Sequence, residues 1–241
     1  MSTVLYVTNA AAPYSPATFR GTWNDTTAAV TKALALSKVA GGALTSVSDV
    51  APDDRAIPIP PAWNGLCYRG VSAALGAQTV SGTLDVLLGV YEDAAAADIC
   101  YHLHAYVTQG DSDTVRGTLL SNYLETTSNE WGTSSTTSGK GLASAQTLTN
   151  VSASAGDRIV VEVGFICRSS LAVAYTGTVQ YGTTSGGSPV GDLTVGGDGT
   201  ALAGFLTFSA NLTFAGTGGP SPFYLPRVLE GGMLSQRGGM L

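Results

Sequence analysis

The sequence is dominated by short segments in which apolar and polar residues alternate, separated by turns rich in Gly, Ser, Thr and Asp. Residues 4–8 (VLYVT), 99–108 (ICYHLHAYVT) and 158–168 (RIVVEVGFICR) show the pattern. Alternation and β-branched residues favour strands that bury one face. With about nine or ten such segments and at most one helix-like stretch, we predict an all-β protein, an antiparallel jelly-roll-like β-sandwich.

Two stretches interrupt this pattern. Asn24 or Asp25 could cap a weak, Thr-rich helix over residues 26–36. Residues 40–61 are rich in Gly and Pro, which predicts a long surface excursion. Residues 158–168 and 171–181 are expected to form a hairpin around Ser169 and Ser170. We therefore divide the chain into an N-terminal strand and excursion packed on the main domain (1–61), the β-sandwich (62–214) and a Gly/Pro-rich docking arm (215–241).

The composition changes after residue 214, where a Gly/Pro linker leads into apolar residues without strand or helix order. A tail that stays free in water is normally charged and poor in aromatic residues. We therefore expect this extended C-terminal arm to dock on another protein surface. Its predicted contact residues are Phe223, Tyr224, Leu225, Val228, Leu229, Met233, Leu234, Met240 and Leu241.

Only 12% of the residues are charged, about half of the ~25% that is usual in soluble domains. No apolar run approaches the ~20 residues of a membrane-spanning helix, and the N-terminus has no signal-peptide pattern. The net charge is −6 and basic residues are scattered, which argues against nucleic acid. Cys67, Cys100 and Cys167 are expected to be buried free thiols. We expect synthesis in a reducing cytoplasm, without a membrane partner.

The search for catalytic chemistry finds no complete motif. His102 and His104 share one strand face, but the pattern lacks the further ligands of a metal site and predicts packing residues. Neither a nucleophile elbow at 70–74 nor a phosphate loop at 134–141 is complete. We expect no enzyme activity, catalytic residue, cofactor or resident metal. The carboxylate pairs are expected in turns or on solvent faces: Glu92/Asp93, Asp111/Asp113, Asp157/Glu162 and Glu125/Glu130.

Two binding alternatives stay open at this point. Calcium could bind the oxygen-rich loops at 110–114 or 196–199, although neither has EF-hand spacing. Trp63 and Trp131 lie near predicted loops, where tryptophan can contact a sugar ring. They are the candidates for contact with a host-surface glycan.

Three longer stretches resemble a known class of protein. They are residues 5–23 (LYVTNAAAPYSPATFRGTW), 110–120 (GDSDTVRGTLL) and 155–164 (AGDRIVVEVG). They resemble virion structural proteins of tailed actinobacteriophages, which are described as minor tail or virion-associated proteins, and the resemblance spans most of residues 1–214. It implies a place in the virion and no active-site motif.

The partners expected from this resemblance are other virion proteins and copies of the chain itself. We favour the tail tip, baseplate or fibre. The alternatives are a capsid decoration protein and a carbohydrate-binding host-recognition module, with a hydrolase third.

Overall fold

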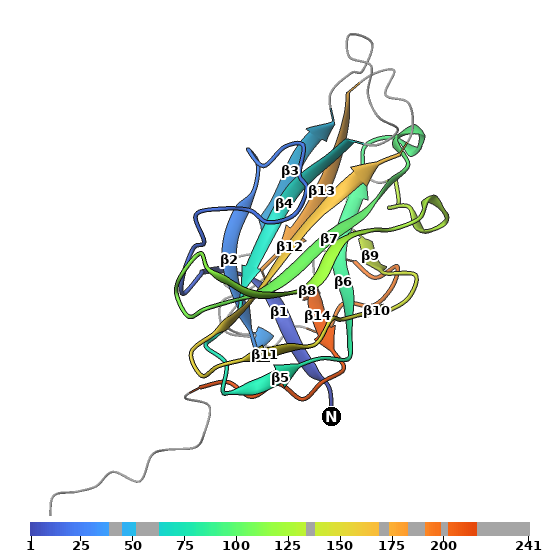
Figure 1. The fold of residues 1–241 in the computed structure, drawn as a ribbon. Coiled ribbons are helices and arrows are strands. Elements are labelled where there is room, and N and C mark those ends of the chain that lie inside the picture. Colours follow the sequence, from blue (N-terminus) through green and yellow to red (C-terminus); the bar gives the residue numbers. More distant parts are fainter. Residues whose placement is uncertain are drawn as a thin grey trace, which may run out of the picture.

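The alternating segments form β-strands throughout the chain, which confirms the all-β prediction (Figure 1). The computed structural model describes residues 1–38, 45–51, 63–133, 138–168, 174–182, 191–198 and 202–215. Short 3-10 turns are the only helical elements among these residues. No helix in this part of the chain is long and apolar enough to cross a bilayer. The predicted docking residues between 223 and 241 lie outside this part of the chain.

Fourteen strands are described, and twelve of them form one large sheet. Its order is β3-β13-β6-β14-β1-β2-β4-β12-β7-β8, with β9 and β10 also paired to β6, while β5 and β11 form a separate two-stranded sheet. Pairing between these strands is antiparallel except for β2 with β4. The bounds are β1 (Thr3–Ala11), β2 (Val30–Ala35), β3 (Thr45–Ala51), β4 (Trp63–Val71), β5 (Gln78–Val80), β6 (Thr83–Glu92), β7 (Ile99–Thr108), β8 (Val115–Leu124), β9 (Ser138–Gly141), β10 (Gln146–Thr147), β11 (Val151–Ala153), β12 (Arg158–Cys167), β13 (Tyr175–Tyr181) and β14 (Phe205–Phe208), with 3-10 turns η3 (Ala95–Ala97) and η4 (Thr127–Asn129).

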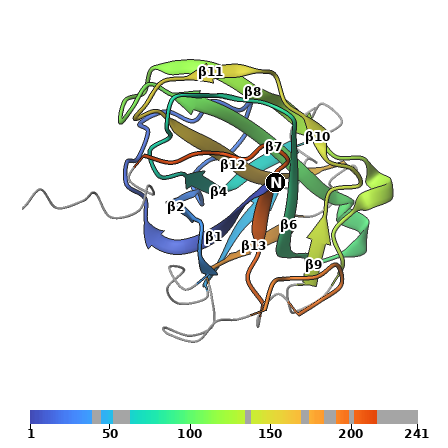
Figure 2. The same cartoon turned by 90° about the horizontal axis from the view of Figure 1, so that it is seen from below.

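The two halves of the large sheet face each other across one apolar core (Figure 2). The rings of Tyr68 on β4 and Tyr181 on β13 lie 5.5 Å apart. Tyr101 on β7 donates a hydrogen bond to the Lys140 carbonyl on β9, at 2.8 Å. These contacts join strands that are distant in the sheet order, so β4, β12, β7 and β8 cover the core from one side and β13, β6 and β14 from the other.

Three local predictions prove wrong. The expected helix over 26–36 is instead strand β2, and Asp25 accepts the Thr27 backbone N–H in a turn. Its Val and Thr residues suit the position between β1 and β4. The expected surface excursion over 40–61 contains strand β3, which pairs with β13. The other residues of this stretch lie outside the described part of the chain.

The expected hairpin between 158–168 and 171–181 does not form. β12 pairs with β4 and β7, whereas β13 pairs with β3 and β6. The two strands meet face to face instead: a Cβ at Gly177 of β13 would lie 2.6 Å from the Phe165 ring of β12. Close packing across the core therefore replaces the predicted ladder.

Both faces of β7 and β12 are buried, although sequence alternation suggested one solvent face. All ten residues of β7 are buried, and so are nine of the ten in β12. The inward residues Tyr101 and Phe165 belong to the main core. The outward residues, including His104 and Glu162, must be covered by another part of the chain.

Candidate functional site

The cover over this outer face is the segment between β1 and β2, residues 13–25, which we call the strap. It has no strand of its own, because Pro13, Pro16 and Gly21 interrupt regular pairing. Its far end is joined to β4, where Asp25 forms a parallel bridge with Gly65. The strap contacts β4, β12, β7 and β8 in turn through the side chains described below.

Glu162 on β12 is the main anchor of the strap. Its Oε1 accepts the Arg20 backbone N–H at 2.9 Å, and its Oε2 accepts the Gly21 N–H at 2.8 Å. The Trp23 indole Nε1–H also donates to Oε2, at 2.8 Å, and the Tyr106 hydroxyl donates to Oε1 at 3.3 Å. A buried carboxylate with four donors is well satisfied, so Glu162 ties the strap to the sheet.

Arg69 on β4 is the second anchor and is almost fully buried. Its guanidinium donates to the carbonyls of Pro16 at 2.6 Å and Thr18 at 3.2 Å, and its Nε donates to Thr31 Oγ1. The Phe19 ring lies 4.3 Å from its central carbon. Burial lowers the pKa of Arg69, whereas nearby Tyr106 and Glu162 act to raise it. The planar fork of arginine suits this simultaneous binding of several backbone oxygens.

The strap is also fastened along the β8 edge. Asp113 accepts the Tyr14 hydroxyl at 2.8 Å and the Ala17 backbone N–H at 2.7 Å. Asn122 accepts the Thr22 N–H through Oδ1 at 2.9 Å. Asn122 adopts a left-handed conformation (φ 45°) at an irregularity in the β7–β8 ladder. The strain of that conformation is compatible with a residue held in place by contacts on both sides.

A buried aspartate joins the turns next to the strap. Asp157 forms an ion pair with Arg116 and accepts the Ser154 and Gly110 backbone N–H groups. Burial acts to raise its pKa, but these donors outweigh burial and lower it. Asp111 pairs with Arg158 in the same region. The carboxylates at one candidate calcium loop, 110–114, are therefore engaged with protein donors, and calcium binding there stays untested.

Of the two histidines, His102 lies directly under the strap and His104 lies beside Tyr106 on the same strand. His102 is fully buried (0% exposed), and neither of its ring nitrogens has a hydrogen-bond partner among the described residues. The Trp23 ring lies over it, with ring centroids 4.1 Å apart. His104 accepts the Asn122 backbone N–H at Nδ1, at 3.3 Å. No group of three or more His, Cys, Asp or Glu in the described chain could hold a metal ion.

The sequence predicted the carboxylates only in part. Asp157 lies in its predicted turn and bonds the local backbone there, although its side chain is buried. Glu92, Glu125 and Glu162 are buried as well, so none of them faces solvent. Glu125 accepts the Ala143 and Thr126 N–H groups, which lower its pKa against the effect of burial. Burial raises the pKa of Glu92 to about 7, and one of its oxygens has no partner among the described residues.

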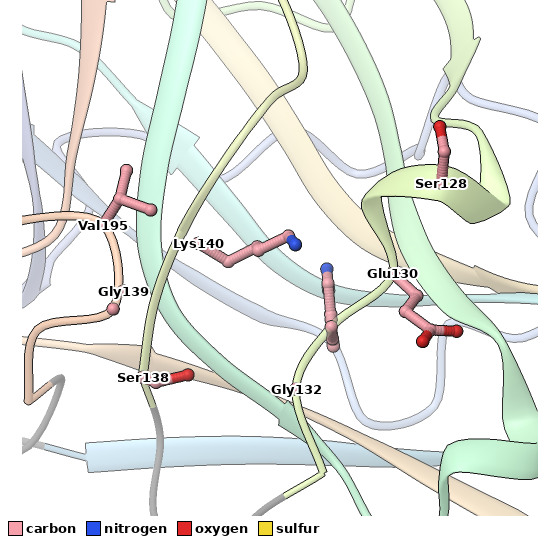
Figure 3. Close-up of a pocket in the computed structure, with 9 residues that line it drawn as sticks. Ser128, Glu130, Gly132, Ser138, Gly139, Lys140 and Val195 are labelled. Atoms are coloured by element: carbon pink, nitrogen blue, oxygen red, sulfur yellow. The ribbon is translucent and has the colours of Figure 1, made fainter.

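A pocket of about 600 Å³ lies at the opposite side of the core, between η4, β9 and the loop around Val195 (Figure 3). Figure 3 shows the Lys140 side chain extending toward its middle, with Glu130 beyond. Burial and a hydrogen bond with Asp98 raise the pKa of Glu130. Trp131 lines this pocket but is 0% exposed, because its ring packs against Tyr101 and Phe165. The pocket thus offers a charged pair and serine hydroxyls, without an open aromatic face.

Trp63 is 9% exposed and packs on Phe165. Like Trp131, it presents no ring face to solvent in this arrangement, so glycan contact through either residue stays a prediction. The three cysteines are buried thiols, as predicted. Sequence reasoning missed Arg69, Asn122 and Trp23 as anchors of the strap. The signal that could have found Arg69 is a charged residue inside an otherwise apolar strand.

Comparison with known proteins gives no assignment. No protein-family model matches the chain, and no curated protein matches it significantly.

Proposed function

We propose that this chain is a non-enzymatic structural protein of a tailed-phage virion, placed in the tail tip, baseplate or fibre. In this proposal the large sheet is a jelly-roll-like sandwich, and the residues after 215 form an arm that docks on a neighbouring subunit. The partners are other virion proteins and copies of the chain itself. A capsid decoration protein is the alternative location within the same class.

The observation that carries the proposal is the meeting of the three stretches that resemble virion proteins. Residues 5–23, 110–120 and 155–164 are distant in sequence, but they supply the strap, the Asp113 loop and the Glu162 strand of one polar cluster. Because the three stretches that resemble virion proteins contact one another and hold the strap in place, they support a fold in common with those proteins. They do not favour a shared catalytic site, because the carboxylates in them are occupied by structural donors.

The facing halves of the sheet support the sandwich proposal. A core enclosed between β4, β12 and β7 on one side and β13 and β6 on the other is how β-sandwiches bury their apolar faces. The glycan-binding alternative receives less support, since both candidate tryptophans are buried. It would require contacts through other side chains.

The test is incorporation into particles of the virus that encodes the chain. We compare the full chain, a truncation that lacks residues 223–241, and a control in which these residues are replaced by Gly and Ser at equal length. Mass spectrometry of purified particles should find the full chain and neither altered form, while all three forms fold alike by circular dichroism. Absence of the full chain from particles would overturn the virion proposal, and normal incorporation of the truncation would overturn the arm.

A further inference from the structure

We propose that the strap, residues 13–25, is released by acid, because protonation of His102 and His104 detaches it from the outer face of β7 and β12. The chain has only these two histidines: Trp23 of the strap covers His102, and His104 contacts Asn122, which holds the strap at Thr22. The released state would uncover a polar sheet face that is hidden at neutral pH. The inference rests on geometry and does not depend on the proposed virion function.

His102 is poorly placed to carry a charge while the strap is closed. Its side chain is fully buried, Trp23 covers its ring, and the residue paired with it on β12 is Gly164, which offers no side-chain acceptor. A proton on this imidazole would add a buried charge, which the Asn122 side chain favours and burial disfavours more strongly. Burial accordingly lowers the pKa of His102 to about 4. Lifting Trp23 is the shortest way to give the charged ring access to water.

His104 acts in the same direction through a hydrogen bond. Its Nδ1 accepts the backbone N–H of Asn122, and the side chain of Asn122 holds the strap at Thr22. An imidazolium has only donors, so protonation at Nδ1 abolishes this bond. Burial also lowers the pKa of His104, although nearby Glu162 acts to raise it. Acid therefore weakens the support of the strap at β8.

The charged groups around the histidines favour release of the strap when His104 is protonated. Glu162 is paired with His104 across the β12–β7 ladder, and it is also the acceptor for the strap. A protonated His104 would compete with the strap for this carboxylate. The other titratable groups that face this cluster are Arg69 from β4, Tyr106 from β7 and Arg20 from the strap itself.

The expected size of the effect follows from His102 alone. Its pKa is about 4 with the strap closed, and release returns the imidazole to water, where its pKa is about 6.5. Between pH 7.5 and pH 5 the open-to-closed ratio of the strap should rise about thirty-fold, because the open state binds the proton more tightly. His104 adds to this change.

The test is hydrogen–deuterium exchange of the full chain at pH 7.5 and pH 5, corrected for the pH dependence of chemical exchange. Peptides that cover residues 13–25 should exchange about thirty-fold faster at pH 5, while peptides of β12 keep their protection. His102→Phe preserves the ring packing and removes the titrating group, so it should abolish most of the acceleration. Glu130→Gln, outside the cluster, should leave the acceleration unchanged.

Equal hydrogen exchange of the strap at both pH values would overturn the proposal. Loss of protection in β12 together with the strap would also overturn it, because that result means global unfolding. An acceleration that persists in His102→Phe would also overturn it. If this variant does not fold, proton NMR of the native chain decides, since two histidines give two resolvable titrations. The proposal requires at least one histidine to titrate together with the strap resonances. Independent titration near pH 6.5 with an unchanged strap would contradict it.

Discussion

Replacing Glu162 by Gln is expected to loosen the strap while the sheet stays intact. The Glu162 carboxylate accepts hydrogen bonds from Arg20, Gly21, Trp23 and Tyr106, two at each oxygen. A glutamine amide keeps one oxygen and turns the other position into an NH₂ group that faces two donors. Two donors then lose a hydrogen bond whichever way the amide points, although in one orientation the Arg20 N–H keeps its longer bond to Oε2, at 3.2 Å.

The magnitude follows from these two lost acceptors. Each buried donor without a partner costs about 1–3 kcal/mol. The neutral amide is cheaper to bury than a carboxylate, which offsets part of the loss. We expect a net destabilisation of the closed strap of about 2–4 kcal/mol, which corresponds to about thirty-fold to several hundred-fold faster hydrogen exchange in residues 18–23.

The assay is hydrogen–deuterium exchange at pH 7.5, together with urea denaturation to follow global stability. Glu130→Gln is the matched control, because it makes the same chemical change in a pocket residue outside the strap. Strap exchange in Glu162→Gln that stays within about two-fold of the native chain would refute the role of Glu162 as the anchor.

Three further predictions concern stability. Glu92→Gln should stabilise the protein above pH 7: the folded-state pKa of Glu92, about 7, exceeds its unfolded value of about 4.5, so native stability falls as pH rises between them. Denaturation at pH 5 and pH 8.5 should show a smaller loss in the variant, and an equal loss would contradict this. Gly177→Ala should cost about 1–3 kcal/mol, because the new Cβ meets the Phe165 ring. Gly132→Ala, where only Ser138 Oγ at 3.7 Å is near, is its control in urea denaturation, and equal midpoints would refute the clash. Arg69→Lys should cost about 2–4 kcal/mol, since an ammonium cannot replace the guanidinium bonds to the strap, and an unchanged thermal midpoint would disprove that role.

The strands and their inner faces could be predicted because alternation is a local property. Tyr101 and Leu103 on β7 point into the core as their spacing indicates. The cover on the outer face could not be predicted, because it depends on pairs such as Trp23 with Glu162, which are 139 residues apart. A Pro- and Gly-rich segment is recognisable as a loop, but its sequence does not say which surface it lies on.

The wrong local predictions have the same physical origin. Residues 26–36 resemble a weak helix when considered alone, but pairing between β1 and β4 favours a strand there. The segments around β12 and β13 are close in sequence, yet they face each other across the core, where Gly177 packs closely on the Phe165 ring. In both cases the tertiary arrangement outweighs the local preference.

The shortage of charge becomes sharper in the structure. Arg69, Glu92, Glu125, Asp157 and Glu162 are buried, so part of an already small set of charges lies inside the protein. The exterior thus carries fewer charged side chains than the sequence contains. A weakly charged exterior suits a protein whose surface is shared with neighbouring subunits, which supports the virion proposal.

The most direct test of the virion proposal is cryo-electron microscopy of intact particles of the phage that this proposal expects to encode the chain. We expect density in the tail tip, baseplate or fibre that fits the large sheet with the strap closed over β7 and β12. The virion proposal would be contradicted if the particles show no ordered density for the chain and mass spectrometry also fails to find it in them.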